Sequence, residues 1–599
     1  MKNINLAAIY HDPFGEYRYT LSSGEIVLMI RVARDDWDSI YTVTFPNYES
    51  YFGNDDNLRV EMYKQASDFM YDYYQVIFSA PDPRVKYIFE LNSGSMKIYF
   101  TPDGLKTYDE IKNKDYQPAF VYSYAYPADP KPEWAIGAIG YQVFPDRFCR
   151  VGKLESGMEE WSSSEYANDR IFGGNIKGIT SKVPYLKRLG VKVIYLNPIF
   201  KSNSSHRYNI NDYFKIDPIL GTEKDLKELC DTLHKHDMRI VLDAVFNHCG
   251  TGFGPFVDAM QRQKESKFYN WFFFGARESV KEGYAAFSFE PEMPKLNLKN
   301  PTTAEYFIEV GKYWIDRCDI DGWRIDVGPE VYPDFWRAFR KEIKNKKPDC
   351  LIINECWGDS RYWCNEGDMF DCNINYSWSD PVWKLFAEQS ISIADFDARI
   401  NRNLISYRLE VGFVQWNMIG SHDTARFLTR ANDRLESLEA AAFFQLTSPG
   451  MPIIYYGDEL GMNGGNDPEC RKPMDWDHSS DSRVLRYYKL LSQLRRRYDA
   501  LSVGDYKTYL IDDEQGIYAY TRGTASETML CIICAKDVGI TKATIKLPSY
   551  ISKQLYIYDE ISQGKYNCSG AYITLPFRYG RCFCFPLSKT LDRLAQEEK

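Results

Sequence analysis

The strongest constraint on the fold is an alternation of apolar strands and amphipathic helices that begins near residue 135. Each apolar run is short, ends in polar residues and is followed by a helical pattern. The eight runs are 138–144, 192–196, 239–245, 322–327, 351–355, 369–371, 413–418 and 452–457. Near-continuous apolar strands that alternate with helices indicate a parallel sheet covered on both faces. Eight such units predict an α/β fold, the (β/α)8 TIM barrel.

The two ends of the chain have a different pattern, and 599 residues are too many for one core at roughly 100–200 residues per domain. Short β-branched and aromatic segments separated by turn signals predict an N-terminal β-sandwich over 1–125. A proline-rich linker follows at 126–135. The barrel is expected over 136–498, with a small inserted domain at about 249–300, where the interval between strands is too long for one βα unit. Residues 499–599 predict a C-terminal all-β sandwich domain with a polar tail over 588–599.

Composition and charge argue against several classes of partner. The net charge of −10 disfavours nucleic acid and anionic membranes. No apolar run approaches the roughly 18–20 residues that cross a bilayer, and Met1–Phe14 lacks the pattern of a signal peptide. The 14 cysteines are scattered singly, which is typical of reduced thiols in a cytoplasmic protein. The aromatic content of 16% suits sugar binding, but an aromatic-rich core explains it equally well.

Acidic side chains follow neighbouring strands of the expected barrel, at the end where barrel active sites form. Asp326 follows the fourth strand and Glu355 the fifth. A retaining glycoside hydrolase needs such a pair, one carboxylate as nucleophile and the other as general acid/base. Arg324 lies on the same side of its strand as Asp326, so we expect it to hold that carboxylate ionised. Asp423, after the seventh strand, is expected to bind sugar hydroxyls and favour a distorted ring.

Three of the seven histidines, His206, His248 and His422, also follow barrel strands. Each alone is compatible with a structural role, but three at the predicted rim favour a binding site. No two of the histidines lie at i, i+4 on one helix, so sugar hydroxyls explain them better than a metal ion does.

Four motifs in this order resemble the α-amylase family of glycoside hydrolases. They are Asp243-Ala-Val-Phe-Asn-His248, Gly322-Trp-Arg-Ile-Asp326, Ile353-Asn-Glu355 and Gly420-Ser-His-Asp423. The segment Met293-Pro-Lys-Leu-Asn297 is similar to a motif of the neopullulanase, cyclomaltodextrinase and maltogenic amylase subgroup. The N-terminal region is similar to the starch-binding-type module of that subgroup.

The resemblance implies cleavage of α-1,4-glucosidic bonds in cyclodextrins, maltooligosaccharides, pullulan or starch through a covalent glycosyl-enzyme intermediate. It assigns Asp326 as nucleophile, Glu355 as acid/base and Asp423 as transition-state stabiliser. It also implies a homodimer through the N-terminal domain. The implied binding residues are Tyr208 under the sugar before the scissile bond, Asp467 and Arg471 at the next sugar on the non-reducing side, Trp357 on the acceptor side, and His206, His248, Arg324 and His422 around the hydroxyls and carboxylates.

The sequence departs from the subgroup at three places, one of which is Asn209, where an Asp usually follows the stacking tyrosine. An Asn/Asp-rich calcium loop is replaced by Cys149-Arg-Val-Gly-Lys153, and Asn175 stands where an Asp is usual. Calcium requires several oxygen ligands, so we expect no cofactor and a lost calcium site.

The third departure is on the acceptor side, where Gly328-Pro329 and Gly358 differ from the usual residues. Transglycosylation therefore remains an alternative to hydrolysis. Strand-end carboxylates also serve as helix caps and ion-pair partners, and barrel relatives exist as non-catalytic scaffolds. The three acidic residues within these motifs argue against that reading.

Overall fold

The structure is a computed structural model that describes residues 4–46, 58–80, 82, 84–112, 118–123, 126–276, 280–477, 482–548 and 555–587. The polar tail expected at 588–599 lies outside the described residues.

The central domain is a barrel of eight parallel strands, as the strand–helix alternation predicts. Its strands are β10 (Gly140–Val143), β11 (Val193–Leu196), β14 (Arg239–Ala244), β15 (Gly322–Ile325), β16 (Leu351–Asn354), β17 (Cys372–Asn373), β18 (Trp416–Met418) and β19 (Met451–Tyr455). The strand order is β17-β16-β15-β14-β11-β10-β19-β18, and a parallel bridge between Ile374 and Trp416 joins the two end strands. Every residue of these strands except Arg239 is buried, which is why the strands appear in the sequence as continuous apolar runs.

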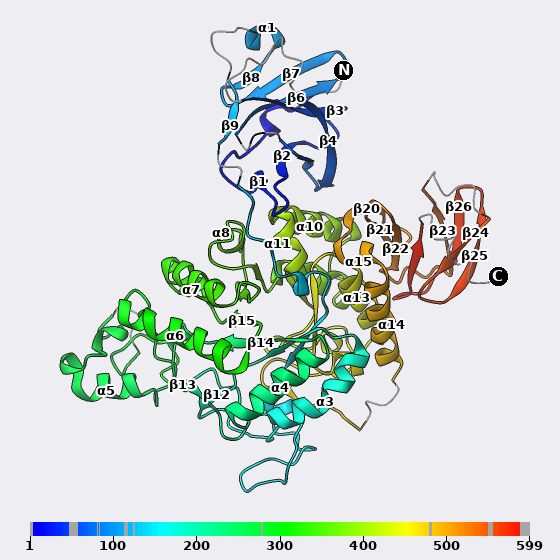
Figure 1. The fold of residues 1–599 in the computed structure, drawn as a ribbon. Coiled ribbons are helices and arrows are strands. Elements are labelled where there is room, and N and C mark those ends of the chain that lie inside the picture. The colour runs from blue at the N-terminus through cyan, green and yellow to red at the C-terminus, as the bar shows by residue number, and fades with distance from the viewer. Residues whose placement is uncertain are drawn as a thin grey trace. The chain divides into compact units, whose positions relative to one another are not determined.

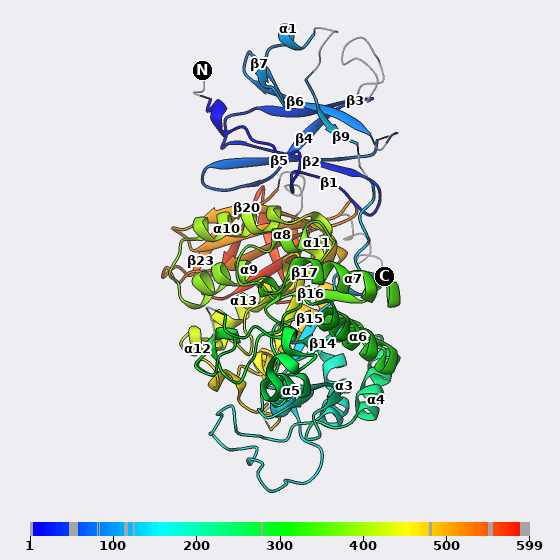
Figure 2. The ribbon, with the colours of Figure 1, turned by 90° about the vertical axis from the view of Figure 1, so that its left-hand side faces the viewer.

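Helices surround the strands (Figures 1 and 2). The longest are α3 (Ile176–Leu189), α4 (Glu223–Lys235), α6 (Pro301–Cys318), α7 (Pro333–Lys346), α13 (Leu435–Thr447) and α14 (Arg483–Arg497). Successive helices pack side by side, α3 on α4, α4 on α6, and α6 on α7. Helix α4 begins with a capping box between Thr222 and Asp225, which satisfies amide groups at its first turn. Shorter helices are α2 (Pro145–Phe148), α8 (Arg361–Cys364), α9 (Tyr376–Val382), α12 (Phe427–Arg430) and α15 (Asp499–Val503).

Two expected barrel strands differ in position from the observed ones. The run at 369–371 ends just before β17, which begins at Cys372. Met369 and Phe370 are buried although they lie outside the strand. The first part of the run at 413–418 belongs to helix α11 (Leu409–Val414), so β18 is shorter than expected. Apolar runs this short do not distinguish a strand from a buried helical turn.

Three long connections emerge at the carboxyl ends of the strands. The loop 149–175 follows α2, and a hairpin of β12 (Phe200–Ser202) and β13 (Ile210–Ile216) follows β11. The segment after β14 contains α5 (Gly254–Arg262) and four isolated bridges, among them His248 with Lys295. These connections supply eight of the 18 residues that line the site described below.

The N-terminal unit is an antiparallel β structure. Its strands are β1 (Arg18–Thr20), β2 (Ile26–Ala33), β3 (Ser39–Pro46), β4 (Leu58–Ser67), β5 (Tyr71–Phe78), β6 (Val85–Ser93), β7 (Met96–Thr101), β8 (Gly104–Lys106) and β9 (Phe120–Tyr122), with one short helix, α1 (Tyr108–Ile111). The main core contains Leu28, Trp37, Tyr87 and Phe89.

Two helices from far along the chain complete this unit, α10 (Ile393–Ser406) and α11. Ile405 and Leu409 pack against a second cluster that includes Tyr19 and Met29. The amide of Leu409 donates to Tyr19 Oη at 3.1 Å. Residues 1–130 and 394–412 therefore form one compact unit from two separate parts of the chain.

The C-terminal domain consists of two four-stranded antiparallel sheets. One contains β20 (Asp505–Asp512), β21 (Ile517–Gly523), β22 (Thr528–Cys534) and β27 (Cys582–Pro586), and the other β23 (Lys542–Lys546), β24 (Tyr556–Asp559), β25 (Gly564–Ser569) and β26 (Tyr572–Pro576). Their apolar faces share a core that contains Leu530, Ile573 and Phe583. Among the residues that the structure describes, no helix is both long and apolar enough to span a bilayer.

Candidate active site

A cleft of about 860 Å³ opens at the carboxyl ends of the barrel strands. Nine of the residues predicted from the sequence line it, namely His206, Tyr208, His248, Asp326, Glu355, Trp357, Asp423, Asp467 and Arg471. The other two, Arg324 and His422, are buried and hydrogen-bonded to residues of the lining. The structure thus brings all the predicted site residues together at one place.

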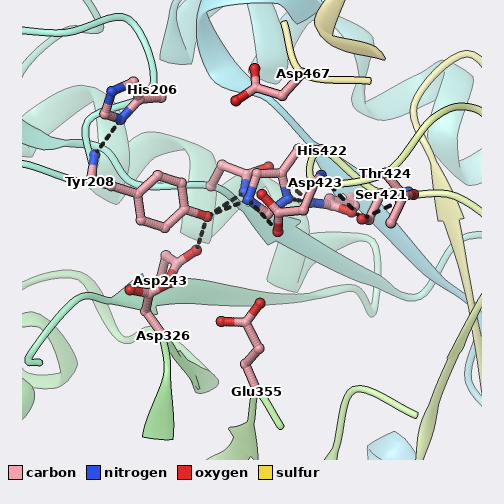
Figure 3. A network of polar contacts seen from close by, with 12 residues as sticks. His206, Tyr208, Asp243, Asp326, Glu355, Ser421, His422, Asp423, Thr424 and Asp467 are labelled. Carbon is pink, nitrogen blue, oxygen red and sulfur yellow. Dashed lines mark hydrogen bonds and ion pairs between the residues drawn. The ribbon is translucent and has the colours of Figure 1, made fainter. Parts of the chain in front are cut away.

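Asp326 and Glu355 are held by the same guanidinium group. Arg324 Nη1 donates to Asp326 Oδ1 at 2.9 Å, and Arg324 Nη2 lies 2.7 Å from Glu355 Oε2. The Nη1 group also donates to Asp243 Oδ1 and Oδ2 at 2.9 and 3.0 Å. Because a guanidinium is rigid and planar, it fixes the two carboxylates relative to each other. Figure 3 shows Asp326 and Glu355 side by side, with Asp423 across from Glu355.

The residue after Asp326 has a strained backbone. Val327 has a φ of 48° and a ψ of 44°, in the left-handed region that β-branched residues avoid. Such a conformation costs on the order of 1–3 kcal/mol. The Val327 N–H donates to Glu355 Oε2 at 3.1 Å. Glu355 therefore has a second donor beside Arg324.

Burial dominates the electrostatics of the acidic cluster. It raises the pKa of Asp326 well above the usual range, and the Arg324 charge opposes this only in part. It raises the pKa of Asp423 to about 7, reinforced by the charge of Glu355, and it raises the pKa of Asp243. The sequence predicts that Arg324 lowers the pKa of Asp326. The arginine does lower it, but burial, which the sequence does not show, raises it by more. The charges of Glu355, Asp243 and Asp423 raise the pKa of Asp326 further, because like charges disfavour ionisation.

A hydrogen-bonded chain connects Asp423 to Asp243 through two ring side chains (Figure 3). Gln142 Nε2 donates to His422 Nδ1 at 2.7 Å, so the ring hydrogen is on Nε2. His422 Nε2 lies 2.6 Å from Tyr208 Oη and 3.2 Å from Asp423 Oδ2. Tyr208 Oη donates to Asp243 Oδ2 at 3.1 Å. Tyr208 is therefore fixed at its hydroxyl end beneath the cleft.

The histidines of the site are neutral. Burial lowers the pKa of His206 and of His248 to about 3, and it lowers that of His422 well below its usual value. His206 Nδ1 accepts the N–H of Tyr208 at 3.0 Å, and the His248 ring stacks on Phe287 at 4.8 Å between centroids. Neutral imidazoles bind hydroxyl groups without adding charge to the cleft.

The cleft also carries an ion-paired group and an aromatic surface. Arg471 Nη1 lies 2.9 Å from Asp467 Oδ1, and Arg471 Nη2 donates to Asp423 Oδ1 at 3.4 Å. Trp357 is 53% exposed and stacks on buried Tyr376 at 3.7 Å and 9°. A ring supported from below and open above offers a flat apolar surface to a ligand.

Eight further lining residues were not predicted from the sequence, namely Asn168, Phe287, Glu290, Glu292, Met293, Val327, Glu330 and Cys356. Pro329, which the resemblance placed on the acceptor side, also lines the cleft. The residues from Phe287 to Met293 directly precede or begin the motif that marked the inserted segment, so their proximity to it was the available signal. Asn168 lies in an irregular loop with no motif. Gln142 is buried and is one polar residue inside an apolar strand, a pattern that indicates a buried hydrogen-bond partner.

In the subgroup that the sequence resembles, the loop after α2 often binds calcium. Here nitrogen donors hydrogen-bond to carbonyl groups of that loop. Arg150 Nη1 donates to the carbonyls of Phe172 and Glu159 at 3.1 and 3.2 Å. Asn175 Nδ2 donates to Val151 O at 2.8 Å. The described residues contain no cluster of three or more His, Cys, Asp or Glu side chains that could hold a metal. Carbonyl oxygens already paired with N–H groups, next to a guanidinium, do not fit a calcium ion.

Comparison with known proteins agrees with the geometry of the cleft. Residues 142–493 match the alpha amylase catalytic domain, and residues 4–126 match the alpha amylase N-terminal ig-like domain. The chain is 38% identical over 540 residues to a maltogenic alpha-amylase of Bacillus acidopullulyticus, covering 88% of this chain and 91% of that protein.

Other relatives have related names. A cyclomaltodextrinase of Geobacillus thermopakistaniensis is 37% identical over 534 residues, which cover 88% of this chain and 90% of the relative. A solved structure named cyclomaltodextrinase superposes with a TM-score of 0.89 at 33% identity, covering 97% of this chain and all of that one. The chain therefore belongs to the α-amylase family of glycoside hydrolases.

Proposed function

We propose that Asp326 is the nucleophile and Glu355 the general acid/base of a retaining α-glucan hydrolase. One observation carries the assignment. The two carboxylates come from the ends of neighbouring strands, line one cleft and bind the terminal nitrogens of the same arginine. A retaining mechanism uses a pair of neighbouring carboxyl groups, and two carboxylates bound to one guanidinium support such a pair.

The reaction proceeds in two steps. Glu355 gives its proton to the glycosidic oxygen while Asp326 attacks the anomeric carbon, so the leaving sugar departs with a new hydroxyl and a glycosyl ester forms on Asp326. Water then attacks the same carbon, Glu355 takes a proton from that water, and the ester bond breaks. Asp423, across from Glu355, accepts hydrogen bonds from sugar hydroxyls as the ring flattens.

The substrates we propose are short or cyclic α-1,4-glucans, with pullulan and starch as further candidates. The cleft volume of about 860 Å³ lies at the upper end of the roughly 300–1,000 Å³ of ligand pockets, which suits an oligosaccharide. The relatives named maltogenic amylase, cyclomaltodextrinase and neopullulanase support this choice. Because Trp357 and Pro329 line the cleft, a sugar bound there would compete with water for the glycosyl ester. A share of transglycosylation is the alternative outcome.

The test compares three variants on β-cyclodextrin, maltotriose and pullulan. We expect Asp326→Asn and Glu355→Gln to lose at least about a hundredfold in kcat. Asp458→Asn is the matched control, because Asp458 is also a buried acid paired with an arginine, Arg426, but does not line the cleft. It should keep its turnover when folded.

Product analysis completes the assignment. NMR of the first product should show the α-anomer, and chromatography should show maltose or longer fragments. A β-anomer as first product, or near wild-type turnover by Asp326→Asn, would contradict the assigned roles. Transfer products that rise with added acceptor sugar would measure the transglycosylation share.

We also propose a cytoplasmic homodimer that forms through the N-terminal unit, with no metal cofactor. Phe14, Phe69 and Met70 on this unit are 85%, 58% and 65% exposed, which is unusual for large apolar side chains and suits a partner surface. A relative named intracellular maltogenic amylase supports the location. Light scattering of the purified protein and of a Phe69→Glu/Met70→Glu variant tests the dimer, and a monomeric wild-type protein would reject it.

A further inference from the structure

A second hollow of about 720 Å³ lies between two loops of the barrel domain, residues 149–166 and 460–477. We call it the loop groove. It shares no lining residue with the catalytic cleft, yet the two are neighbours along the chain. Tyr166 and Lys472 line the groove, whereas Asn168 and Arg471 line the cleft. Arg471 Nη1 donates to Asn168 Oδ1 at 3.2 Å and ties the intervening wall together.

Three partly exposed aromatic rings line the loop groove, those of Trp161, Tyr166 and Trp476. The indole N–H of Trp161 donates to Met474 O at 2.9 Å, and that of Trp476 donates to Phe148 O at 2.5 Å. Because both indole N–H groups are already bonded, the surface that the two tryptophan rings present is apolar.

The rings are also supported by their neighbours. Tyr166 stacks on Phe172 at 6.3 Å and 25°. The Lys182 ammonium lies 3.8 Å from the centroid of Trp476 and covers one of its faces. Rings held in this way lose little conformational freedom when a ligand binds.

The polar groups of the loop groove carry both signs of charge. Arg150 and Lys472 are cationic, and Glu160, Asp475 and Asp477 are acidic. Lys472 Nζ donates to Asn463 Oδ1 at 3.1 Å, so part of this polar rim is already ordered. A mixed rim attracts neither a phosphate nor a cation strongly. It does offer many donors and acceptors to a neutral ligand rich in hydroxyl groups, and aromatic faces suit the apolar faces of sugar rings.

We propose that the loop groove is an accessory binding site for a neutral α-glucan chain, which it holds beside the catalytic cleft. The ligand class rests on the proposed function, but the site is separate from the reacting carboxylates. We expect its effect on long substrates, because only these can occupy the cleft and the loop groove together across the wall formed by residues 166–168 and 471–472.

The experiment uses full-length variants and two substrates, soluble starch and maltotriose. Trp161→Ala removes one ring, and Ser162→Arg places a bulky side chain in the groove at an exposed position. Trp134→Ala is the matched control, because the Trp134 indole also donates to a backbone carbonyl, at 3.0 Å, but it lies outside both hollows. We expect KM for starch to rise about three- to tenfold in both groove variants, with kcat/KM for maltotriose within about twofold of wild type.

A direct binding measurement removes turnover from the test. In an Asp326→Asn background, electrophoresis through gels that contain soluble starch should show retardation, and Ser162→Arg should reduce it. Wild-type starch KM and retardation in folded Ser162→Arg would overturn the proposal, as would a change in oligomeric state without a change in KM, which would make the groove a protein contact. Failure of the proposed function looks different, since the wild-type enzyme would then hydrolyse neither substrate.

Discussion

Replacement of Arg324 by methionine separates the electrostatic role of this arginine from its structural role. Arg324 is buried and contacts Asp243, Asp326 and Glu355. Methionine keeps much of the side-chain length but removes the charge and all of these donors. Loss of one partner from a buried ionic cluster costs about 3–5 kcal/mol of folding free energy, a large fraction of the usual total of about 5–15.

The same change alters the pH dependence of catalysis. The charge of Arg324 lowers the pKa of Asp243, of Asp326 and of Asp423, against the larger effect of burial. Without it these pKa values rise, because a neighbouring positive charge favours the ionised form of a carboxyl group. A nucleophile must be ionised, so the acid limb of the kcat/KM profile should move to higher pH. Activity should therefore be lost more severely at pH 5 than at pH 9.

The assay is a pH profile of kcat/KM on maltotriose, together with urea unfolding. Arg340→Met is the control, because Arg340 is also buried and donates to Asp371 at 2.9 Å, and neither residue lines the cleft. Asp371 keeps Lys131 and Lys344 as partners, so the stability loss should be smaller and the pH profile unchanged. An acid limb at its wild-type position in folded Arg324→Met would refute this account of the cluster.

Three further changes test other parts of the structure. Calcium or EDTA should leave the melting temperature of the wild-type protein unchanged within about 1 °C, and stabilisation by calcium would contradict this. Arg150→Ala should lower the melting temperature by a few degrees, because two carbonyls of the 149–175 loop lose their donor. A Cβ on Gly328 would lie 2.1 Å from Asn354 Oδ1, so Gly328→Ala should lower the free energy of unfolding by about 1–3 kcal/mol. Asn354→Ala in the same chain should recover part of that loss in a double-mutant cycle measured by urea unfolding. Strictly additive effects of the two substitutions would exclude the clash. Tyr185→Phe should cost about 1–3 kcal/mol in urea, because buried Glu459 Oε1 accepts the Tyr185 hydroxyl at 2.8 Å, and an unchanged midpoint would contradict it.

The barrel was predictable from the sequence because each strand is buried on both faces and ends in polar residues. The same rule placed Asp326 and Glu355 on neighbouring strands, and the spacing of Arg324 and Asp326 placed both on one side of β15. These inferences need only the period of a strand and the polarity of a barrel. That is why the acidic cluster could be expected without coordinates, although the catalytic roles of its members remain a proposal.

Other features depend on contacts that no local pattern encodes. Gln142 and His422 meet only because β10 and the loop after β18 converge in the closed barrel. The left-handed backbone of Val327 contradicts the preference of its own side chain, so it follows from the surroundings. The net direction of the Asp326 pKa shift depends on burial, which composition does not give. Phe287, which lines the cleft, comes from an irregular segment whose path the sequence does not define.

The N-terminal unit contains residues that the ribosome delivers at very different times. Residues 1–130 emerge first, but the helical segment 394–412 that contributes Ile405 and Leu409 to its second apolar cluster emerges only after most of the barrel strands. The ribosome adds about 5–20 residues per second, so this cluster is completed roughly a quarter to one minute after residue 130 has been synthesised. For the same reason, a cut after residue 130 does not separate two self-sufficient pieces. The shortened enzyme would carry an uncovered apolar helix face, and its aggregation would reflect that face rather than a lost sugar-binding function.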